Sequence, residues 1–252
     1  MVVMKDHVTG LWTILSYTLR KLLVSRRIFI TLLIAVFVGG VMAYATTQKM
    51  DNLAGGTDML DNLVLSFFMP VMAMIYGSSL VRDEIDDRSI TQVVASPMDR
   101  MVTYSGYYLG LAASVCAAIL LVLTTGFLVY FGALGFGAGS GHVYGSMVAL
   151  VVIGSFAYSA LFILVSVLIS HPIYFGLLYA FIWEGYIGSI PGNIRLLAIK
   201  HYIRSLGAHW IDVGAISSYN ASTPSDAASV LVVLTVVILV LGALAFREKE
   251  FP

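Results

Sequence analysis

The chain has 252 residues, of which 59% are hydrophobic and 11% are Asp, Glu, Lys or Arg, with a formal net charge of zero. In soluble domains these four residue types make up about 25% of the sequence. A water-soluble fold of this size would therefore have too few charged residues to cover its surface. These values exclude most cytosolic enzymes and nucleic-acid binders, and also intrinsic disorder, which requires low hydrophobicity. The mean hydropathy of +0.92 indicates a polytopic membrane protein.

The N-terminal segment 8–26 has the pattern of an amphipathic helix. Its apolar residues recur at the steps of three and four that define one helix face. They are Val8, Leu11, Trp12, Leu15, Leu19, Leu22 and Leu23, and the basic residues are Arg20, Lys21, Arg26 and Arg27. A helix with Trp and cations suits the headgroup plane of a membrane. We predict such an interfacial helix; the alternative is an N-terminal helix packed on the bundle.

Six stretches are long and apolar enough to cross a membrane as helices. We expect them at residues 28–44, 63–81, 107–129, 143–169, 173–190 and 228–246. With the N-terminus in the cytoplasm, ten Lys and Arg residues lie on the inner side and four on the outer side. Because inner loops are enriched in these residues, the sequence predicts six spans with both termini cytoplasmic. We predict that residues 1–252 form a single transmembrane domain. We expect this domain to lie in the cell membrane.

The predicted loops differ in composition. The loop between spans one and two is acidic, with Asp51, Asp58 and Asp61, and the glycine-rich loop between spans three and four fits a flexible turn. The longest loop, 191–227, mixes apolar residues with Arg and His. Such a mixture favours short helices at the outer interface.

The cytoplasmic link 82–100 between spans two and three is dense in charge, since eight of its nineteen residues are charged. Ser89 and Gln92 have the spacing of a capping box, and Pro97 should end the helix that they begin. The sequence therefore predicts a short amphipathic helix that a soluble partner could hold. The alternative is a solvated loop kept inside by its arginines.

Glu184 is the only acid inside a predicted span. A charged carboxylate in the membrane centre costs about 2.5–3.5 kcal/mol on insertion scales. We therefore expect this carboxyl to be protonated, paired or near water. It could line a transport path, but a structural bond to local backbone, Arg195 or Arg204 is favoured.

Two segments together resemble the type-2 permeases of ATP-binding-cassette (ABC) transporters. One is the link with Glu84 after span two, a Ser turn, an apolar helix, Pro97 and Arg100 before span three. The other is the fifth-span region, with Phe-Ile-Trp-Glu-Gly at 181–185 and His-Tyr-Ile-Arg-Ser-Leu at 201–206. The topology is similar to that family over nearly the whole chain.

The resemblance implies that the link 82–100 holds a coupling helix, which sits in a cleft on a separate ATPase subunit. The implied contact residues are Glu84, Arg88, Ser89, Ile90, Val93, Val94, Pro97 and Arg100. The chain has no G-x-x-x-x-G-K-[ST] motif, so it should bind no cofactor itself, and the partner should use ATP and Mg²⁺. Two ATPase copies, a second permease copy and membrane lipid are the implied partners, with no nucleic acid. Export is the direction that the family implies.

Other readings remain open at this point. The chain could be an ATP-independent transporter or an intramembrane enzyme that uses Glu184, or an anchor that recruits a soluble complex. His201 and His209 lack further ligands for a zinc site, and Asn220 lies in a glycosylation tripeptide that is common by chance. The helix walls do not identify a cargo.

Overall fold

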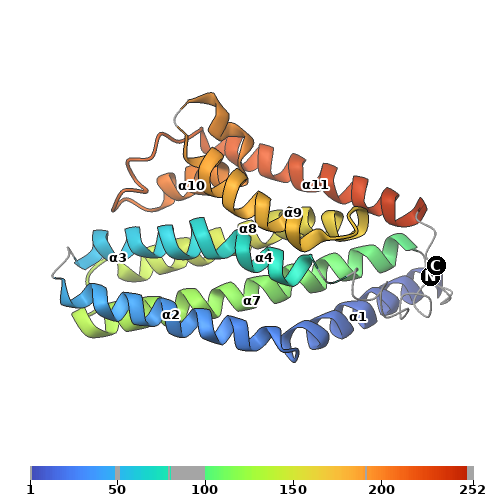
Figure 1. The fold of residues 1–252 in the computed structure, drawn as a ribbon, viewed down its shortest axis with the longest axis horizontal. Coiled ribbons are helices and arrows are strands. Elements are labelled where there is room, and N and C mark those ends of the chain that lie inside the picture. Colours follow the sequence, from blue (N-terminus) through green and yellow to red (C-terminus); the bar gives the residue numbers. More distant parts are fainter. Residues whose placement is uncertain (1, 49–51, 79, 81–99, 191, 249–252) are drawn as a thin grey trace.

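A computed structural model describes residues 2–48, 52–78, 80, 100–190 and 192–248, and every regular element in these ranges is a helix. Five helices are long and apolar enough to cross a membrane. They are α2 (Arg27–Thr47), the helix Leu53–Gly77, α7 (Arg100–Leu134), α8 (Ser140–Leu168) and α11 (Pro224–Glu248). Figure 1 shows most of them side by side along the long axis, with α11 lying obliquely across the others. The predicted all-helical membrane architecture is thus confirmed, whereas the six-span count stays a prediction.

The second long helix starts well before the predicted boundary at Leu63. It consists of α3 (Asn52–Leu60), the π-helical segment η1 (Asp61–Phe68) and α4 (Met69–Gly77). The acids that the sequence placed in a loop, Asp58 and Asp61, therefore lie on a helix. Both carboxylates accept hydrogen bonds from residues more than a hundred positions away, which the hydropathy pattern cannot show.

A chain of short elements stands where the sequence predicted span five at 173–190. It comprises α9 (Pro172–Leu178), the π-helical segment η2 (Tyr179–Tyr186) and the turn η3 (Ile187–Ser189). The next segment contains η4 (Asn193–Leu197) and α10 (Ile199–Trp210), which are short helices of the kind predicted for the long loop. The π-helical turns η1 and η2 each carry one buried acid, Asp61 and Glu184.

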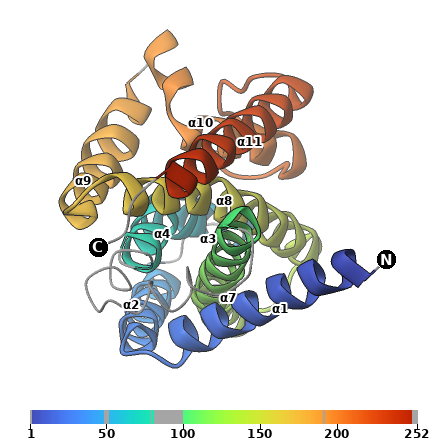
Figure 2. The ribbon, with the colours of Figure 1, turned by 90° about the vertical axis from the view of Figure 1, so that its right-hand side faces the viewer.

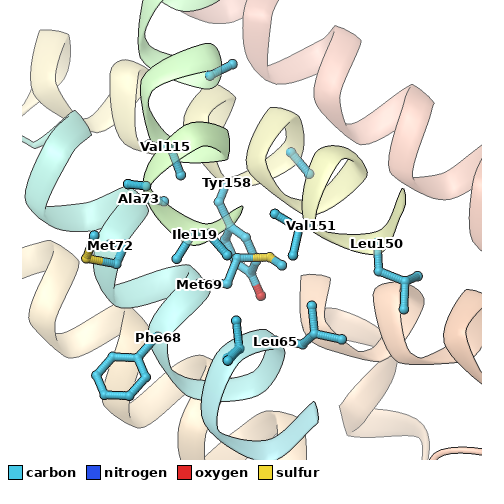
Figure 3. Packing of buried hydrophobic residues seen from close by; sticks show 14 of the residues in the cluster. Leu65, Phe68, Met69, Met72, Ala73, Val115, Ile119, Leu150, Val151 and Tyr158 are labelled. Atoms are coloured by element: carbon cyan, nitrogen blue, oxygen red, sulfur yellow. The ribbon is translucent and has the colours of Figure 1, made fainter. Parts of the chain in front are cut away.

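The core lies between α4, α7 and α8. Met69 from α4, Ile119 from α7 and Val151 from α8 are fully buried, and Tyr158 inserts its ring among them (Figure 3). Hydrocarbon is as apolar as these side chains, so close fit rather than water exclusion holds such helices together. The ring of Tyr158 therefore contributes by filling the space where three helices meet.

The N-terminal helix α1 (Val2–Leu23) packs along α7 outside this core (Figure 2). Ile14, Thr18 and Leu22 form its buried stripe, whereas Trp12 is 67% exposed. A Cβ at Gly106 or Gly110 would lie within 3.0 Å of Ile14 or Thr18. These two glycines of α7 therefore create the seam, and they shift the buried stripe from the predicted apolar face to one that includes a threonine.

The start of α7 and the end of α11 lie at the same end of the bundle as the start of α1 (Figure 1). Arg100, the first residue of α7, donates a hydrogen bond from Nη1 to the backbone oxygen of Arg247, at 2.7 Å. We call this the terminal end. Helices α3 and α10 lie toward the other end, which we call the polar end.

Candidate functional site

Glu184 occupies the centre of a polar cluster at the polar end. Its side chain is fully buried, and its carboxylate accepts three hydrogen bonds. The backbone N–H of Ile199 donates to Oε1 at 3.0 Å, that of Lys200 donates to Oε2 at 3.1 Å, and the Tyr179 hydroxyl donates to Oε1 at 2.7 Å. The first two donors are otherwise unsatisfied amides at the N-terminus of α10, where a negative charge is favourable. Glu184 therefore caps α10 from a neighbouring segment.

Lys200 closes the same contact from the other side. Its Nζ donates to the backbone oxygen of Glu184 at 2.7 Å and to the Ser189 hydroxyl at 3.0 Å. Burial lowers the pKa of Lys200, and the nearby charge of Glu184 partly opposes this shift. The Lys200 side chain thus joins η2 and η3 to α10, and it places a positive charge near the Glu184 carboxylate.

A second buried acid holds α10 one turn further along the helix. The Arg204 guanidinium donates to Oδ2 of Asp61 at 2.7 Å, and the carboxyl-bearing side chain is 1% exposed. Asp61 lies on η1 and Arg204 on α10, so this ion pair joins the second long helix to α10. One turn earlier, Asp58 accepts a hydrogen bond from the backbone N–H of Ala215, which fixes the loop after α10 to α3.

The loop 211–223 folds back on α10 through His201. The imidazole Nδ1 lies 2.8 Å from the Tyr219 hydroxyl and Nε2 lies 2.9 Å from the Ser222 hydroxyl. Burial, with a further contribution from Arg195, lowers the pKa of His201 to about 4. The ring is therefore neutral at pH 7 and serves as a hydrogen-bonding spacer.

Tyr219 is also the aromatic contact for two cations. The Arg204 guanidinium carbon lies 4.9 Å from its ring centroid and that of Arg195 lies 5.6 Å away. Guanidinium groups at this distance are attracted to the face of an aromatic ring. The ring thus connects the Asp61–Arg204 pair to the His201 bonds, and the cluster becomes continuous.

The cluster can join helices, but the described residues offer little for chemistry. In the ranges given above, no group of three His, Cys, Asp or Glu side chains could hold a metal ion. The carboxylate of Glu184 is occupied by three donors, and His201 by two hydroxyls. This geometry supports the structural alternative for Glu184, with backbone amides as its partners in place of Arg195 or Arg204.

Most of the predicted coupling residues lie outside the described ranges: Glu84, Arg88, Ser89, Ile90, Val93, Val94 and Pro97. The exception is Arg100, which begins α7 and bonds to the C-terminal end of α11. The structure therefore links the exit of this segment to the last helix.

Sequence reasoning did not pair Arg204 with Asp61 or Lys200 with Glu184. The available signal was their scarcity, because charged residues make up only 11% of the chain. A charged residue that interrupts an apolar pattern is costly unless paired, so Asp61 and Arg204 could have been matched as opposite charges. The choice of Arg204 over Arg195 needs the fold.

Comparison with known proteins gives the family. A family profile described as "ABC-2 family transporter protein" matches residues 19–191, which is well over half of the chain. The chain belongs to this family. It is thus a membrane component of a transporter, as the resemblance to type-2 ABC permeases predicted. No curated protein matches the chain.

The matched region contains both acids that hold α10, Asp61 and Glu184, together with the whole link 82–100. Helices α10 and α11 lie beyond it. The polar cluster of this ABC-2 protein therefore joins the matched helices to the segment that follows them.

Proposed function

We propose that this chain is the permease subunit of an ABC exporter and that a separate ATPase drives it through residues 82–100. The observation that carries the proposal is the family match over residues 19–191, which includes this link. The charged and apolar residues of the link suit a groove on a soluble protein. ATP and Mg²⁺ are bound by the partner, and this chain supplies the path through the membrane.

In this proposal the chain crosses the cell membrane six times, with α9, η2 and η3 forming the fifth crossing. The terminal end faces the cytoplasm, which is supported by the excess of Lys and Arg on that side. The polar end with α10 then faces outward. Six spans form half of a transporter, so two permease copies and two ATPase copies make the working unit.

The polar cluster supports a role for α10 as part of an outer gate. Glu184 on η2 holds the N-terminus of α10, and Asp61 on η1 holds its middle through Arg204. If ATP-driven movement of the coupling segment shifts the second helix relative to the fifth, one of these attachments must move or break. The cluster would thus keep the outer side closed until both helices move.

Co-purification tests the partner. The tagged chain is purified from its native membrane, and associated proteins are identified by mass spectrometry with ATPase activity as a second readout. We expect an ABC ATPase with the wild type, and its loss with Glu84→Arg or Val93→Asp. Asp226→Arg, an exposed acid at the start of α11, is the matched control that should retain it. Absence of an ATPase from the wild-type preparation would contradict the proposal.

Cysteine labelling tests the topology. Cys116 is the single cysteine, so a Cys116→Ser background permits one new cysteine at a time. Gly137, Ser170 and Ser225 are exposed residues in loops or at a helix start. An impermeant maleimide should label Gly137→Cys and Ser225→Cys in intact cells, and Ser170→Cys only after permeabilisation. Equal labelling of Ser170→Cys and Ser225→Cys would show that α9, η2 and η3 do not cross the membrane.

The rival mechanism, an ATP-independent transporter or enzyme that uses Glu184, predicts a carboxylate free to exchange a proton or contact substrate. The three donors on Glu184 oppose this. An anchoring role without transport would be indicated if the ATPase copurifies with the wild type but its activity is the same with and without this chain.

A further inference from the structure

The solvent-exposed side of α1 carries a basic hollow that has no part in the transport cycle proposed above. The hollow has a volume of about 400 Å³ and is lined by Tyr17, Arg20, Lys21, Val24 and Ser25. Residues 17, 20, 21 and 24 lie at the three- and four-residue steps of one helix face. This face is separate from the buried stripe of Ile14, Thr18 and Leu22.

The lining residues combine two kinds of recognition. Arg20 and Lys21 supply adjacent cations, and a guanidinium can bond two oxygens of one phosphate. Tyr17 and Val24 supply apolar surface, being 49% and 77% exposed. The ammonium of Lys21 lies 5.8 Å from the Tyr17 ring centroid, which keeps the charge next to that surface.

The helix that follows the hollow in the chain also exposes apolar side chains. Helix α2 begins at Arg27, and its exposed side chains include Phe29, Leu33 and Val36, at 69%, 69% and 74%. A free phosphate or nucleotide would meet the cations but leave this surface uncovered. A molecule with an anionic head and a hydrocarbon tail fits both parts.

We infer that the hollow on α1 binds the headgroup of an anionic phospholipid, with the phosphate at Arg20 and Lys21 and an acyl chain along α2. The headgroup would then lie along the last turns of α1. Because α1 packs on α7 through Gly106 and Gly110, a bound lipid would fix α1 against the helix that follows the link 82–100.

The test compares lipids and matched charge variants. The full chain, with any subunits that it retains, is stripped of lipid and titrated with phosphatidylglycerol or phosphatidylcholine of identical acyl chains. Native mass spectrometry reads the bound lipid. We expect phosphatidylglycerol to bind more tightly, and Arg20→Gln to weaken it about fivefold, which corresponds to the roughly 1 kcal/mol expected per surface cation.

Arg26→Gln is the matched control, because it removes the same charge from an exposed residue of the same segment that does not line the hollow. It should change the affinity less than about twofold, since only the longer-range surface attraction is reduced. Arg20→Lys, which keeps the charge, should retain most of the binding. Circular dichroism and gel filtration verify that the variants fold.

Three results would overturn the inference. Equal losses with Arg20→Gln and Arg26→Gln would mean diffuse attraction to a basic surface. Equal affinity for the two lipids would mean that no anionic site exists. Displacement of phosphatidylglycerol by millimolar inorganic phosphate would identify a soluble anion as the ligand. None of these results depends on whether an ATPase copurifies.

Discussion

At the polar end, buried charged groups join three segments that are distant in sequence, whereas at the terminal end two helices meet through glycines. The attachments of α10 are directed hydrogen bonds, such as that between Arg204 and Asp61. The contact of α1 with α7 depends on close approach at Gly106 and Gly110. Removing one partner of a buried ion pair abolishes its whole contribution to stability. A packed contact between helices loses stability in proportion to the change in side-chain volume.

This difference suits the gate proposed for the polar end. A gate requires a small number of strong attachments that can be broken together, and the polar cluster has them. Four changes test the comparison, from the largest expected effect to the smallest.

Arg204→Ala should have the largest effect. It leaves the Asp61 carboxylate buried without its cation and also removes the guanidinium from the Tyr219 ring. Breaking a buried ion pair from one side typically costs about 3–5 kcal/mol. The free energy of unfolding, measured by denaturant titration in micelles, should fall by that order.

The double variant Asp61→Asn with Arg204→Ala distinguishes pairing from packing. Removing the stranded charge should recover part of the loss, so the two changes should not add. Additive losses would mean that Asp61 and Arg204 act independently, and the polar end would then not differ in kind from the seam.

Glu184→Ala should rank second. It deprives two backbone amides of α10 and the Tyr179 hydroxyl of their acceptor. Lost caps and buried unpaired donors together suggest a cost of about 2–4 kcal/mol. Thermal unfolding should reveal it, with early loss of the α10 region in hydrogen exchange.

Glu184→Gln separates a structural from a chemical role. The amide oxygen can still accept from Ile199 and Tyr179, but its NH₂ group would face the N–H of Lys200. We expect roughly half of the destabilisation and retained ATPase stimulation in the assembled transporter. A stable protein that has lost all coupled activity would instead mean that the carboxylate takes part in transport.

Gly110→Ala tests the terminal end. Its Cβ would lie 2.6 Å from Cβ of Thr18, closer than side-chain atoms approach. Overpacking of this kind costs about 1–3 kcal/mol, and α1 should loosen from α7. Proteolysis within α1 and the free energy of unfolding measure the two effects.

Gly132→Ala is the control in the same helix, because nothing lies within 4 Å of its added Cβ. Alanine is a better helix former than glycine by roughly 0.5–1 kcal/mol, so this variant should be neutral or stabilised. Destabilisation of both variants alike would show that helix propensity, and not the seam, determines the result.

The sequence predicted the features that depend on local pattern. Long apolar runs predicted helices, and the segment 8–26 predicted a helix where α1 lies, although α1 buries a different face from the predicted one. The family was predicted from the link around Glu84 and the fifth-span motif around Glu184, and the comparison confirmed it. Each of these signals is contained within a single stretch of the chain.

The features that depend on distant partners were not predicted. Asp58 and Asp61 were assigned to a loop because acids lower the local hydropathy, yet their partners Ala215 and Arg204 make a helix possible there. Likewise Thr18 is buried because Gly106 and Gly110 leave room for it. Pairing and fit between elements are not encoded in the period of either one.

The pH dependence of the polar end comes last because it is absent at neutral pH, where the other variants are compared. The pKa of His201 is lowered to about 4 in the folded protein, against 6.5 for the ordinary side chain, mainly by burial. Between these values the unfolded chain binds a proton that the folded chain does not, so stability falls as the pH decreases. The contribution is fully present above pH 6.5, and its loss stops growing below about pH 4.

His201→Gln isolates this contribution from other titrating groups. Glutamine retains hydrogen-bonding atoms but does not titrate. Because its amide does not reproduce the fit of the imidazole between Tyr219 and Ser222, the variant should be less stable than the wild type at pH 7.5. As the pH is lowered to 5, the gap between their unfolding temperatures should narrow, because only the wild type loses stability through this group. A gap that stays constant would show that position 201 does not titrate, and a widening gap would mean that the protonated imidazole is stabilised in the folded state. Only a narrowing gap fits a polar end held by a neutral, buried histidine. Adding Gly110→Ala at the terminal end to both proteins should leave the change of this gap with pH the same.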